Sequence, residues 1–367
     1  MHIGIDASRA FLRYRTGIEE YSYQVVKHLR DTIPSQGSVH LYVRKKLRVR
    51  NWKPVFIYPE IDFSLPSNWE LRGIWAPRFW TQVGLSLEML LHPVDTLFVP
   101  AHTLPLIGGK RNIVTVHGLE YEMSPLSYGF WERLYMRLSI RYSCMKADRI
   151  IAVSENTKQD LVELYGIQKN KITIIGEGFI SYPKINNPQQ ESSPYLLFIG
   201  RLEERKNVVR IIEAFEILKE RYQIAHRLLL IGKKGHGYGK IQSKIQESRF
   251  KKDIEELGYV SFDKKQTLFQ NSVAFIFPSL YEGFGLPVLE AQAVGVPVVT
   301  SSTSSLPEVG GGGALYVDPM SSESIAEGIY TVLRMNAEEK IVLQGKMEKN
   351  LERFSWEKCA REISSYF

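Results

Sequence analysis

Short apolar runs that alternate with helical patterns constrain the fold of this 367-residue chain more than any other feature. Apolar runs of about four to eight residues, each followed by a segment with helical spacing, are typical of parallel β-sheets covered by helices. Nine such runs fall in two sets, 2–6, 96–100, 112–117, 149–154 and 171–175, then 195–200, 227–232, 273–278 and 296–300. The sequence therefore predicts an α/β protein with parallel sheets.

A polar segment with three prolines separates the two sets of runs. It covers residues 181–194, and its composition is that of an interdomain linker. A chain of 367 residues also exceeds the usual size of a single core. We therefore expect two Rossmann-like domains, residues 1–180 and 195–349, with ligand-binding loops at the carboxyl ends of their strands.

The composition is that of a soluble globular protein, with 44% hydrophobic and 24% charged residues. No apolar run approaches the roughly 20 residues that span a bilayer. Residues Met1 to Asp6 alternate like a first strand and lack the features of a signal peptide, so we expect a cytoplasmic protein. Two cysteines, Cys144 and Cys359, are too few for a disulfide framework or a zinc site, and we expect buried thiols.

The formal net charge of +7 is concentrated in the first half of the chain, where residues 1–180 hold 23 Lys and Arg against 17 Asp and Glu. A dense basic cluster is followed by tryptophans: Arg44, Lys45, Lys46, Arg48, Arg50 and Lys53, then Trp52, Trp69, Trp75 and Trp80. This combination suits peripheral contact with an anionic membrane. The alternative is a solvated loop with the tryptophans in the core. Nothing resembles a nucleic-acid-binding module, so we expect no nucleic acid partner.

The segment from Glu282 to Glu290, EGFGLPVLE, carries the strongest functional signal. Pro287 suits a first helical position because its missing N–H would have no intrahelical partner there. The amides of Gly285 and Leu286 would then point out of a helix N-terminus, which attracts phosphate. Glycines at 283 and 285, on either side of Phe284, let the backbone approach that phosphate closely. Glu290 would accept from ribose hydroxyls, and Glu282 would reach a sugar attached to the diphosphate.

This segment, with the preceding Ser279-Leu280-Tyr281 and the following AQAVGVPVV, resembles the signature of retaining GT-B glycosyltransferases of family 4, the group 1 transferases. The resemblance covers nearly the whole chain. It implies two Rossmann-like domains that face each other across a deep cleft, with a C-terminal helix at about 350–367 packed back on the first domain. It also implies transfer of a hexosyl group from a nucleoside diphosphate sugar to a hydroxyl of a glycan or lipid-linked acceptor, with retention.

Further motifs match the family residue by residue. Arg201 and Lys206 match the G-R-x-x-x-x-K element that holds the donor diphosphate and neutralises the leaving group. Arg205, in the same loop, is expected to be solvated. In Val153-Ser154-Glu155-Asn156-Thr157-Lys158, Ser154 resembles the family's helix cap, which is a structural role. The backbone of Gly258-Tyr259-Val260 is expected to face the nucleobase.

The first domain contributes two expected site residues through the resemblance. Gly17 follows the first strand and would let the backbone approach the β-phosphate, although a plain helix N-terminus explains it nearly as well. His117 matches the histidine of the family's H-D-L element and would face the transferred sugar, but Gly118 replaces the aspartate. His102 also ends a strand, so a place beside the acceptor and a structural role both stay open.

No D-x-D motif occurs, so neither a metal nor any cofactor besides the donor sugar nucleotide is implied. The donor could be GDP-mannose or a UDP-sugar. Two alternatives share the fold: a nucleotide-sugar epimerase or hydrolase, and an inactive sugar-nucleotide-binding scaffold. Both fit the sequence less well, because epimerases and hydrolases normally lack the complete EGFGLPVLE run, and a scaffold would not need all of the charged site residues.

Overall fold

The computed structural model describes all residues except 13, 51–52, 77 and 182–192. The predicted linker therefore lies mostly outside the described residues. The chain forms two compact units, the first made of residues 1–119, 130–178 and 355–367 and the second of 120–129 and 179–354. The sequence predicted neither the grouping of 120–129 with the second unit nor the start of the returning segment at 355.

The first unit is built on a seven-stranded sheet in which every pairing is parallel. Its order is β5 (Trp69–Ile74), β2 (Ser38–Arg44), β1 (His2–Asp6), β6 (Thr96–Val99), β7 (Arg111–Val116), β8 (Arg149–Ala152) and β9 (Ile172–Ile174). The five strands predicted in this half are confirmed, whereas β2 and β5 were missed. The central strands are apolar because helices cover both of their faces.

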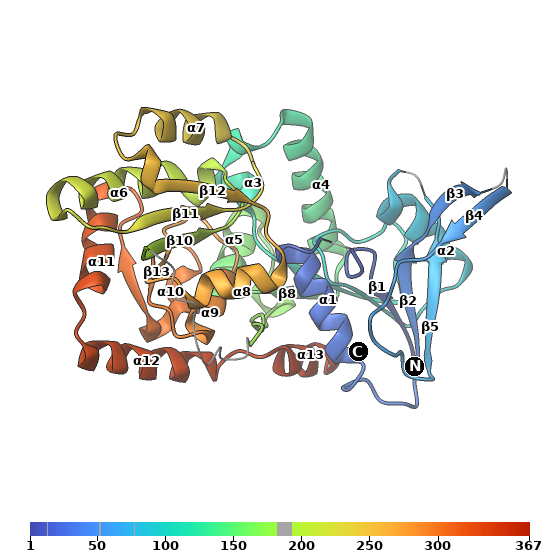
Figure 1. Ribbon diagram of the computed structural model, residues 1–367. Helices are drawn as coiled ribbons and strands as arrows, with labels where there is room; N and C mark the ends of the chain where they lie inside the picture. Colours follow the sequence, from blue (N-terminus) through green and yellow to red (C-terminus); the bar gives the residue numbers. More distant parts are fainter. Residues whose placement is uncertain (13, 51–52, 77, 182–192) are drawn as a thin grey trace. The chain divides into compact units, whose positions relative to one another are not determined.

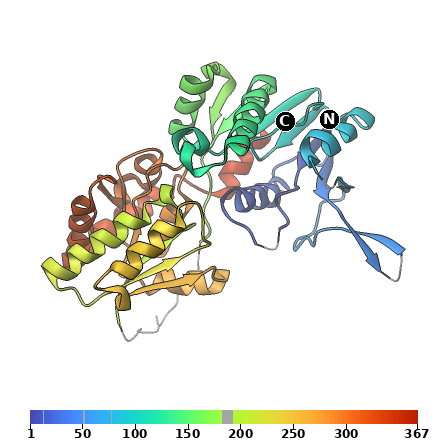
Figure 2. The same ribbon diagram turned by 90° about the horizontal axis from the view of Figure 1, so that it is seen from above.

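Helices of the first unit connect these strands. They are α1 (Gly17–Leu29), the π-helix η1 (Trp80–Leu85), α2 (Ser86–Leu91), α4 (Phe130–Lys146), α5 (Glu155–Tyr165), the 3-10 turn η3 (Lys169–Lys171) and α13 (Trp356–Ser364). The last helix, α13, packs against α1, and Figures 1 and 2 show the two side by side. Ser154 caps α5 by accepting from the amide of Thr157 at 3.1 Å, as predicted.

The basic cluster forms an antiparallel hairpin rather than a loop, with strands β3 (Lys46–Arg50) and β4 (Lys53–Ile57) (Figure 1). Of the nearby tryptophans, Trp69 and Trp80 are buried, Trp75 is exposed and Trp52 lies outside the described residues. The expectation of a loop is therefore wrong, although Arg44 and Lys46 are exposed to solvent as expected. The expectation of core tryptophans is correct for two of them.

The second unit has a six-stranded parallel sheet. Its order is β12 (Ile254–Gly258), β11 (Arg227–Ile231), β10 (Tyr195–Ile199), β13 (Ala274–Phe277), β14 (Val298–Ser301) and β15 (Ala314–Val317). The chain runs outward from β10 to one edge and then from β13 to the other. The strand order thus reverses between β10 and β13, and at such a reversal the two following loops leave a crevice for ligands.

Helices flank this second sheet. They are η4 (Glu204–Lys206), α6 (Val208–Tyr222), α7 (Tyr238–Glu247), η5 (Lys251–Asp253), α8 (Phe262–Gln270), α9 (Leu286–Ala293), α10 (Leu306–Gly310), η6 (Gly311–Gly313), α11 (Ser322–Arg334) and α12 (Ala337–Leu351). The unit also includes α3 (Glu120–Met123) and η2 (Pro125–Ser127). No helix among the described residues of either unit has the length and apolar character needed to cross a membrane.

Candidate active site

Two loops meet where the strand order of the second sheet reverses. Residues 200–207 follow β10 and residues 278–285 follow β13. The amide of Leu280 donates to the carbonyl of Arg205 at 2.9 Å. Asn207 is buried with a left-handed backbone, and its Nδ2 donates to the carbonyls of Pro278 at 3.0 Å and Pro319 at 2.6 Å. Both loops are therefore fixed to one another before any ligand arrives.

A buried carboxylate lies between two cations from these loops. Glu282 Oε1 accepts from Lys206 Nζ, and Glu282 Oε2 lies 3.2 Å from Arg205 Nη1. Arg205 also pairs with Glu203 at 2.8 Å and donates to the carbonyl of Tyr281 at 2.7 Å. The expectation that Arg205 is solvated is wrong, because the η4 turn places its side chain between Glu203 and Glu282, where it is largely buried. We call Arg205, Lys206 and Glu282 the charged triad.

The charged triad perturbs its own ionisation. Burial alone would raise the pKa of Glu282, but Lys206 and Arg205 hold that pKa below its usual range. Burial opposes the charge on Arg205, yet Glu282 raises the pKa of Arg205 above its usual value. Burial lowers the pKa of Lys206, although Glu282 opposes the shift. These directions favour an ionised Glu282 and a charged Arg205 beside the buried Lys206.

Arg201 extends the charge of this loop toward solvent. Its side chain is 61% exposed, and its Nε lies 3.9 Å from Glu203. With Arg201 included, and with Glu204 of the loop paired to Lys240 at 2.9 Å, the cluster holds four cations, Arg201, Arg205, Lys206 and Lys240, against the three carboxylates of Glu203, Glu204 and Glu282. One positive charge is therefore in excess, which suits an anionic ligand. Arg201 and Lys206 thus lie in the same loop as predicted, one exposed and one buried.

The glycine turn before α9 is held from behind by two serines. Ser305 Oγ donates to the carbonyls of Glu282 at 2.9 Å and Phe284 at 2.6 Å, and Ser304 Oγ accepts from the Glu282 amide at 2.8 Å. Gly285 has φ of 120°, and a Cβ there would lie 2.8 Å from Leu306. A glycine is therefore required at this position.

Helix α9 begins at Leu286, so Pro287 takes its second position rather than its first. The N–H groups of a first helical turn lack intrahelical partners and carry the positive end of the dipole. The side chain of Phe284 is buried and packs edge-on against Phe354 at 5.8 Å, so the backbone of the turn, and not this ring, is suited to a ligand. Gly283 lies in the same turn.

Glu290 has a partner that the sequence did not reveal. Its Oε1 accepts from Lys265 Nζ of α8 at 2.6 Å, and Glu290 is buried. The two residues are 25 positions apart, and no local spacing connects them. A ribose that binds Glu290 would therefore do so beside a cation. The contact with ribose itself stays a prediction.

A cavity of about 560 Å³ opens at the carboxyl ends of β10, β11 and β12. Gly258 and Tyr259, from the segment expected to face the nucleobase, are among its lining residues. Lys233 lies over the ring of Tyr259 at 5.0 Å. Val260 does not line this cavity but packs against the hydrophobic core of the unit, so its expected donor contact rests on its backbone.

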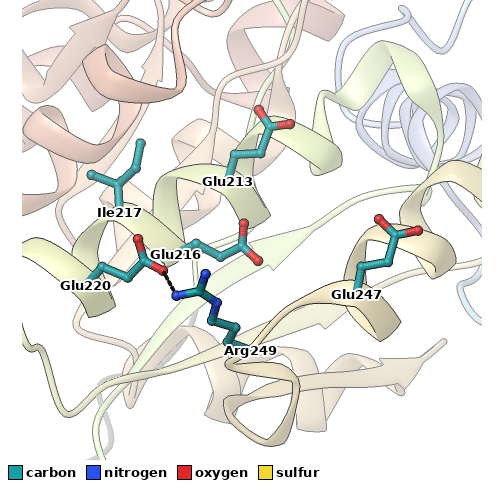
Figure 3. A pocket seen from close by; sticks show the side chains of 6 residues that line it. All are labelled: Glu213, Glu216, Ile217, Glu220, Glu247 and Arg249. Carbon is teal, nitrogen blue, oxygen red and sulfur yellow. Dashed lines mark hydrogen bonds and ion pairs between the residues drawn. The ribbon is translucent and has the colours of Figure 1, made fainter.

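A second hollow, of about 330 Å³, lies between α6 and α7 and is drawn in Figure 3. Four of its six lining residues are glutamates: Glu213, Glu216, Glu220 and Glu247. Glu216 pairs with Lys244 at 2.8 Å and Glu220 with Arg249 at 3.4 Å. The concentration of carboxylates would repel a diphosphate, so this hollow does not fit the predicted donor.

In the first unit, His117 is buried with both ring nitrogens engaged. Its Nδ1 lies 3.0 Å from Glu177 Oε1, and its Nε2 lies 2.9 Å from the Pro100 carbonyl oxygen. A carbonyl oxygen only accepts, so Nε2 is the donor in that bond. The ring also packs edge-on against Tyr21 at 4.4 Å. The sequence missed Glu177, which is 60 residues from His117; contact of His117 with a sugar stays a prediction.

The neighbours of His117 explain two other sequence features. Gly118 has φ of 145°, so the aspartate of the family pattern would be strained there. The ring of His102 lies 5.4 Å from that of His117, and burial lowers the pKa of His102 well below its usual value. A neutral, half-buried His102 fits a structural role.

Gly17 begins α1 with φ of 38°, and a Cβ there would meet nothing within 4 Å. The carboxylate of Glu19 accepts from the amide and hydroxyl of Thr16 at 3.3 and 2.8 Å, which closes the helix start. The open space beside Gly17 agrees with close approach of a ligand, and its φ agrees equally with a helix start. Over the part of the chain that the structure describes, no three His, Cys, Asp or Glu side chains gather as metal ligands.

Comparison with known proteins connects this geometry to a family. Residues 15–179 match the model of Glycosyltransferase Family 4, and residues 183–351 match that of Glycosyl transferases group 1. The O-antigen chain mannosyltransferase B of Escherichia coli is 28% identical over 268 residues, 70% of each chain. The O-antigen chain mannosyltransferase RfbU of Salmonella typhimurium strain LT2 is 26% identical over 321 residues, 86% of this chain and 87% of that one.

Solved structures agree on the fold. The sucrose-phosphate synthase of Thermosynechococcus elongatus superposes with a TM-score of 0.75 at 17% identity, covering 100% of this chain and 98% of that one. Two Rossmann-like units with these strand orders make up the GT-B fold. The two family models together span both units, and the glycine turn and its cations lie in the second. The chain therefore belongs to the group 1 glycosyltransferases of family 4.

Proposed function

We propose that this glycosyltransferase moves a hexosyl group, mannose first among the candidates, from a nucleoside diphosphate sugar to an acceptor hydroxyl with retention of configuration. The observation that carries the proposal is the charged triad beside the glycine turn of α9. Mannose is proposed because both relatives named above are mannosyltransferases. GDP-mannose and UDP-sugars both stay open as donors.

The chemistry follows from the charges at the turn. As the bond from the sugar to the β-phosphate oxygen breaks, Lys206, Arg201 and the first amides of α9 stabilise the negative charge that the diphosphate gains. The acceptor hydroxyl forms the new bond on the same face, and its proton passes to the departing phosphate oxygen. Glu282 is a poor nucleophile because two cations hold its carboxylate. Its proposed role is to position the sugar and orient Lys206.

The same charges lead us to propose transfer without a metal. Side-chain cations and a helix N-terminus supply the positive charge that a divalent ion would otherwise bring to the diphosphate. Transfer should therefore persist in excess EDTA. Loss of transfer on chelation, with recovery on adding Mn²⁺ or Mg²⁺, would overturn this part of the proposal.

For the acceptor we propose a lipid-linked glycan in polysaccharide synthesis, since the named relatives act on O-antigen chains. Such an acceptor would place the enzyme at the cytoplasmic face of a membrane. The basic residues of the first unit, including the exposed Arg44 at the end of β2 and Lys46 at the start of the hairpin, would be attracted to an anionic membrane surface.

The test is to incubate the protein with a panel of GDP- and UDP-sugars, with and without glycan acceptors, and to measure nucleotide release. The anomeric configuration of the product is then read by NMR. We expect acceptor-dependent release with one donor and retention in the product. Nucleotide release that does not depend on an acceptor would indicate a hydrolase. A product with inverted anomeric configuration would contradict the proposed same-face mechanism.

A further inference from the structure

The outer face of α4 is apolar although it is exposed to solvent. Its inner face is formed by buried Ile140, Ser143 and Cys144. On the opposite face, Trp131 is 77% exposed, Leu138 59% and Met145 57%. These residues, with Tyr135 and Tyr142 between them, follow one another at alternating steps of four and three and form a single stripe along the helix. A helix that only covers a sheet would carry polar residues there.

The apolar surface continues from α4 onto α2 through a short loop. Tyr142 Oη donates to the carbonyl of Leu106 at 3.0 Å. The amides of Leu106 and Ile107 donate to Ser86 Oγ, at the start of α2, at 2.9 and 3.3 Å. Leu106 itself is exposed, and so are Leu87 and Leu90 of α2. We call the surface made by Leu87, Leu90, Leu106, Trp131, Leu138 and Met145 the α2–α4 face; all six belong to the first unit.

The concentration of exposed apolar residues in the first unit is not a property of the whole protein. Among the described residues, 22 of the 29 exposed large apolar side chains belong to the first unit, although the two units are of similar length. Single exposed apolar residues are common, but a contiguous group of this kind marks an interaction site.

The charged residues beside the apolar stripe indicate which partner binds this face. Helix α4 carries Arg133, Arg137, Arg141 and Lys146 against one acidic residue, Glu132. At about 100° per residue, Arg141 and Lys146 lie on opposite flanks of the apolar stripe. Both are exposed. A second copy of this chain would bring the same excess of positive charge against the face, whereas anionic lipid headgroups would pair with the flanking cations while the apolar stripe enters the acyl boundary.

We propose that the α2–α4 face docks the enzyme on an anionic bilayer surface. The inference deepens the proposed function, since it identifies the surface that would bring the first unit to a lipid-linked acceptor. It places the main contact on α2 and α4 and gives the basic hairpin region a smaller share. Its test measures lipid binding and not transfer, so its failure and the failure of the proposed function are distinguishable.

The experiment is co-sedimentation of the full chain with vesicles of phosphatidylcholine containing about a third phosphatidylglycerol. The face variant is Trp131→Ser with Leu138→Ser. The matched control is Ile341→Ser with Val342→Ser, two exposed apolar residues on α12 of the second unit. We expect at least about a tenfold weaker partition for the face variant and no change for the control.

Salt and charge variants give the second arm. Arg141→Gln with Lys146→Gln should weaken binding by about fivefold for each charge at low salt, and by much less at high salt. Binding to pure phosphatidylcholine should be weak for every variant. Circular dichroism and transfer to a short water-soluble acceptor should match wild type for the face variant, because its two changes are on the surface.

Four outcomes would overturn the proposal. The first is that wild type binds neither vesicle, and the second is that wild type and the face variant bind equally. The third is that binding is lost only when Arg44, Lys45, Lys46 and Arg48 become Ser. The fourth is that light scattering shows a wild-type dimer which the face variant converts to a monomer. The third would assign the contact to the hairpin region, and the fourth would assign the face to a second copy.

Discussion

The two units balance their buried polar groups in different ways. In the second unit, the charged triad sets two full positive charges against the buried carboxylate of Glu282. In the first unit, the buried ring of His117 is held by one carboxylate and one carbonyl, and the nearby Tyr21 hydroxyl lies 3.2 Å from Thr115 Oγ1. This difference agrees with the proposed function, in which the second unit binds the anionic diphosphate and the first contacts the transferred sugar. Variants of each unit should consequently fail in different ways.

The largest expected effect comes from breaking the charged triad. Arg205→Met leaves Glu203 and Glu282 with less compensation in a buried place, which typically costs about 3–5 kcal/mol of unfolding free energy. The control Arg249→Met removes an exposed pair with Glu220 and should cost below about 1 kcal/mol. Urea unfolding followed by circular dichroism measures both. All six tryptophans lie in the first unit, so their fluorescence would not report this change directly.

The same variant gives a pH test whose sign is fixed by Glu282. A carboxylate with a lowered pKa in the folded state stabilises above its unfolded pKa, and this contribution is lost as pH falls through the folded pKa. The stability difference between wild type and Arg205→Met should therefore be full at neutral pH and shrink below about pH 4.3. A difference that stays constant down to pH 2 would show that the triad is not held by charge.

The next largest effect concerns transfer. Lys206→Ala and Arg201→Ala should each slow transfer by about a hundredfold or more, because each removes a cation from the leaving group. Their stabilities should differ: Arg201 is mostly exposed, and its loss should change unfolding free energy by no more than about 0.5 kcal/mol. Lys206 is buried against Glu282, so its loss should destabilise the second unit.

The control for these two variants is Lys240→Ala, which removes an exposed pair with Glu204 and should leave turnover unchanged. Wild-type turnover in Lys206→Ala or Arg201→Ala would show that the substituted residue does not stabilise the diphosphate. Equal stability loss in both would show that burial does not distinguish them.

A smaller effect separates Glu290 from Glu282. Glu290→Ala should weaken binding of the free nucleoside diphosphate, because the ribose hydroxyls lose a charged acceptor that contributes about 1.5–3 kcal/mol. Glu282→Ala should not weaken that binding, since it releases Lys206 and Arg205 from their shared carboxylate, but it should slow transfer. Calorimetry with the diphosphate and turnover assays test both. An equal loss of affinity in the two variants would contradict the sugar-facing role of Glu282.

Nine of the thirteen described strands in the two large sheets, and the glycine turn, could be predicted from the sequence because their signals are local. Buried parallel strands are apolar throughout, and the glycines and Pro287 mark the start of α9 within a few residues. The partners of the site could not be predicted. Lys265 reaches Glu290 from α8, Ser304 reaches the turn across 22 residues, and Glu177 reaches His117 across 60. Such pairs exist only after the loops have been brought together by the sheet.

Three features were misjudged or missed, each for its own physical reason. Strand β5 was missed because it lies at the edge of its sheet, where only its two end residues are buried and its pattern is mixed. Arg205 was expected to be exposed to solvent because most cationic side chains in such loops are exposed. The loop instead curls into the η4 turn and places Arg205 beside Glu282. The exposed stripe of α4 was not recognised, since its residues have ordinary helical spacing and only the structure shows which face is buried.

The smallest expected effect tests whether the units respond separately. Cys144 and Cys359 are both buried in the first unit, and burial raises the pKa of Cys144 to about 12 and that of Cys359 well above its usual value. At pH 8 only about one Cys144 thiol in ten thousand would be ionised, so a disulfide reagent should not label the native protein. Labelling in increasing urea therefore reports unfolding of the first unit.

Because each unit has its own sheet and core, we expect Arg205→Met to lower the urea midpoint of the second unit while the labelling midpoint of Cys144 and Cys359 stays within about 0.2 M of wild type. Cys144→Ala and Cys359→Ala identify which thiol reacts. If the labelling midpoint falls together with the circular dichroism midpoint, the two units unfold as one, and the charge balance of the second unit stabilises the first as well. If the native protein is labelled within seconds, the thiols are not buried as described, and the comparison of the two units loses its probe.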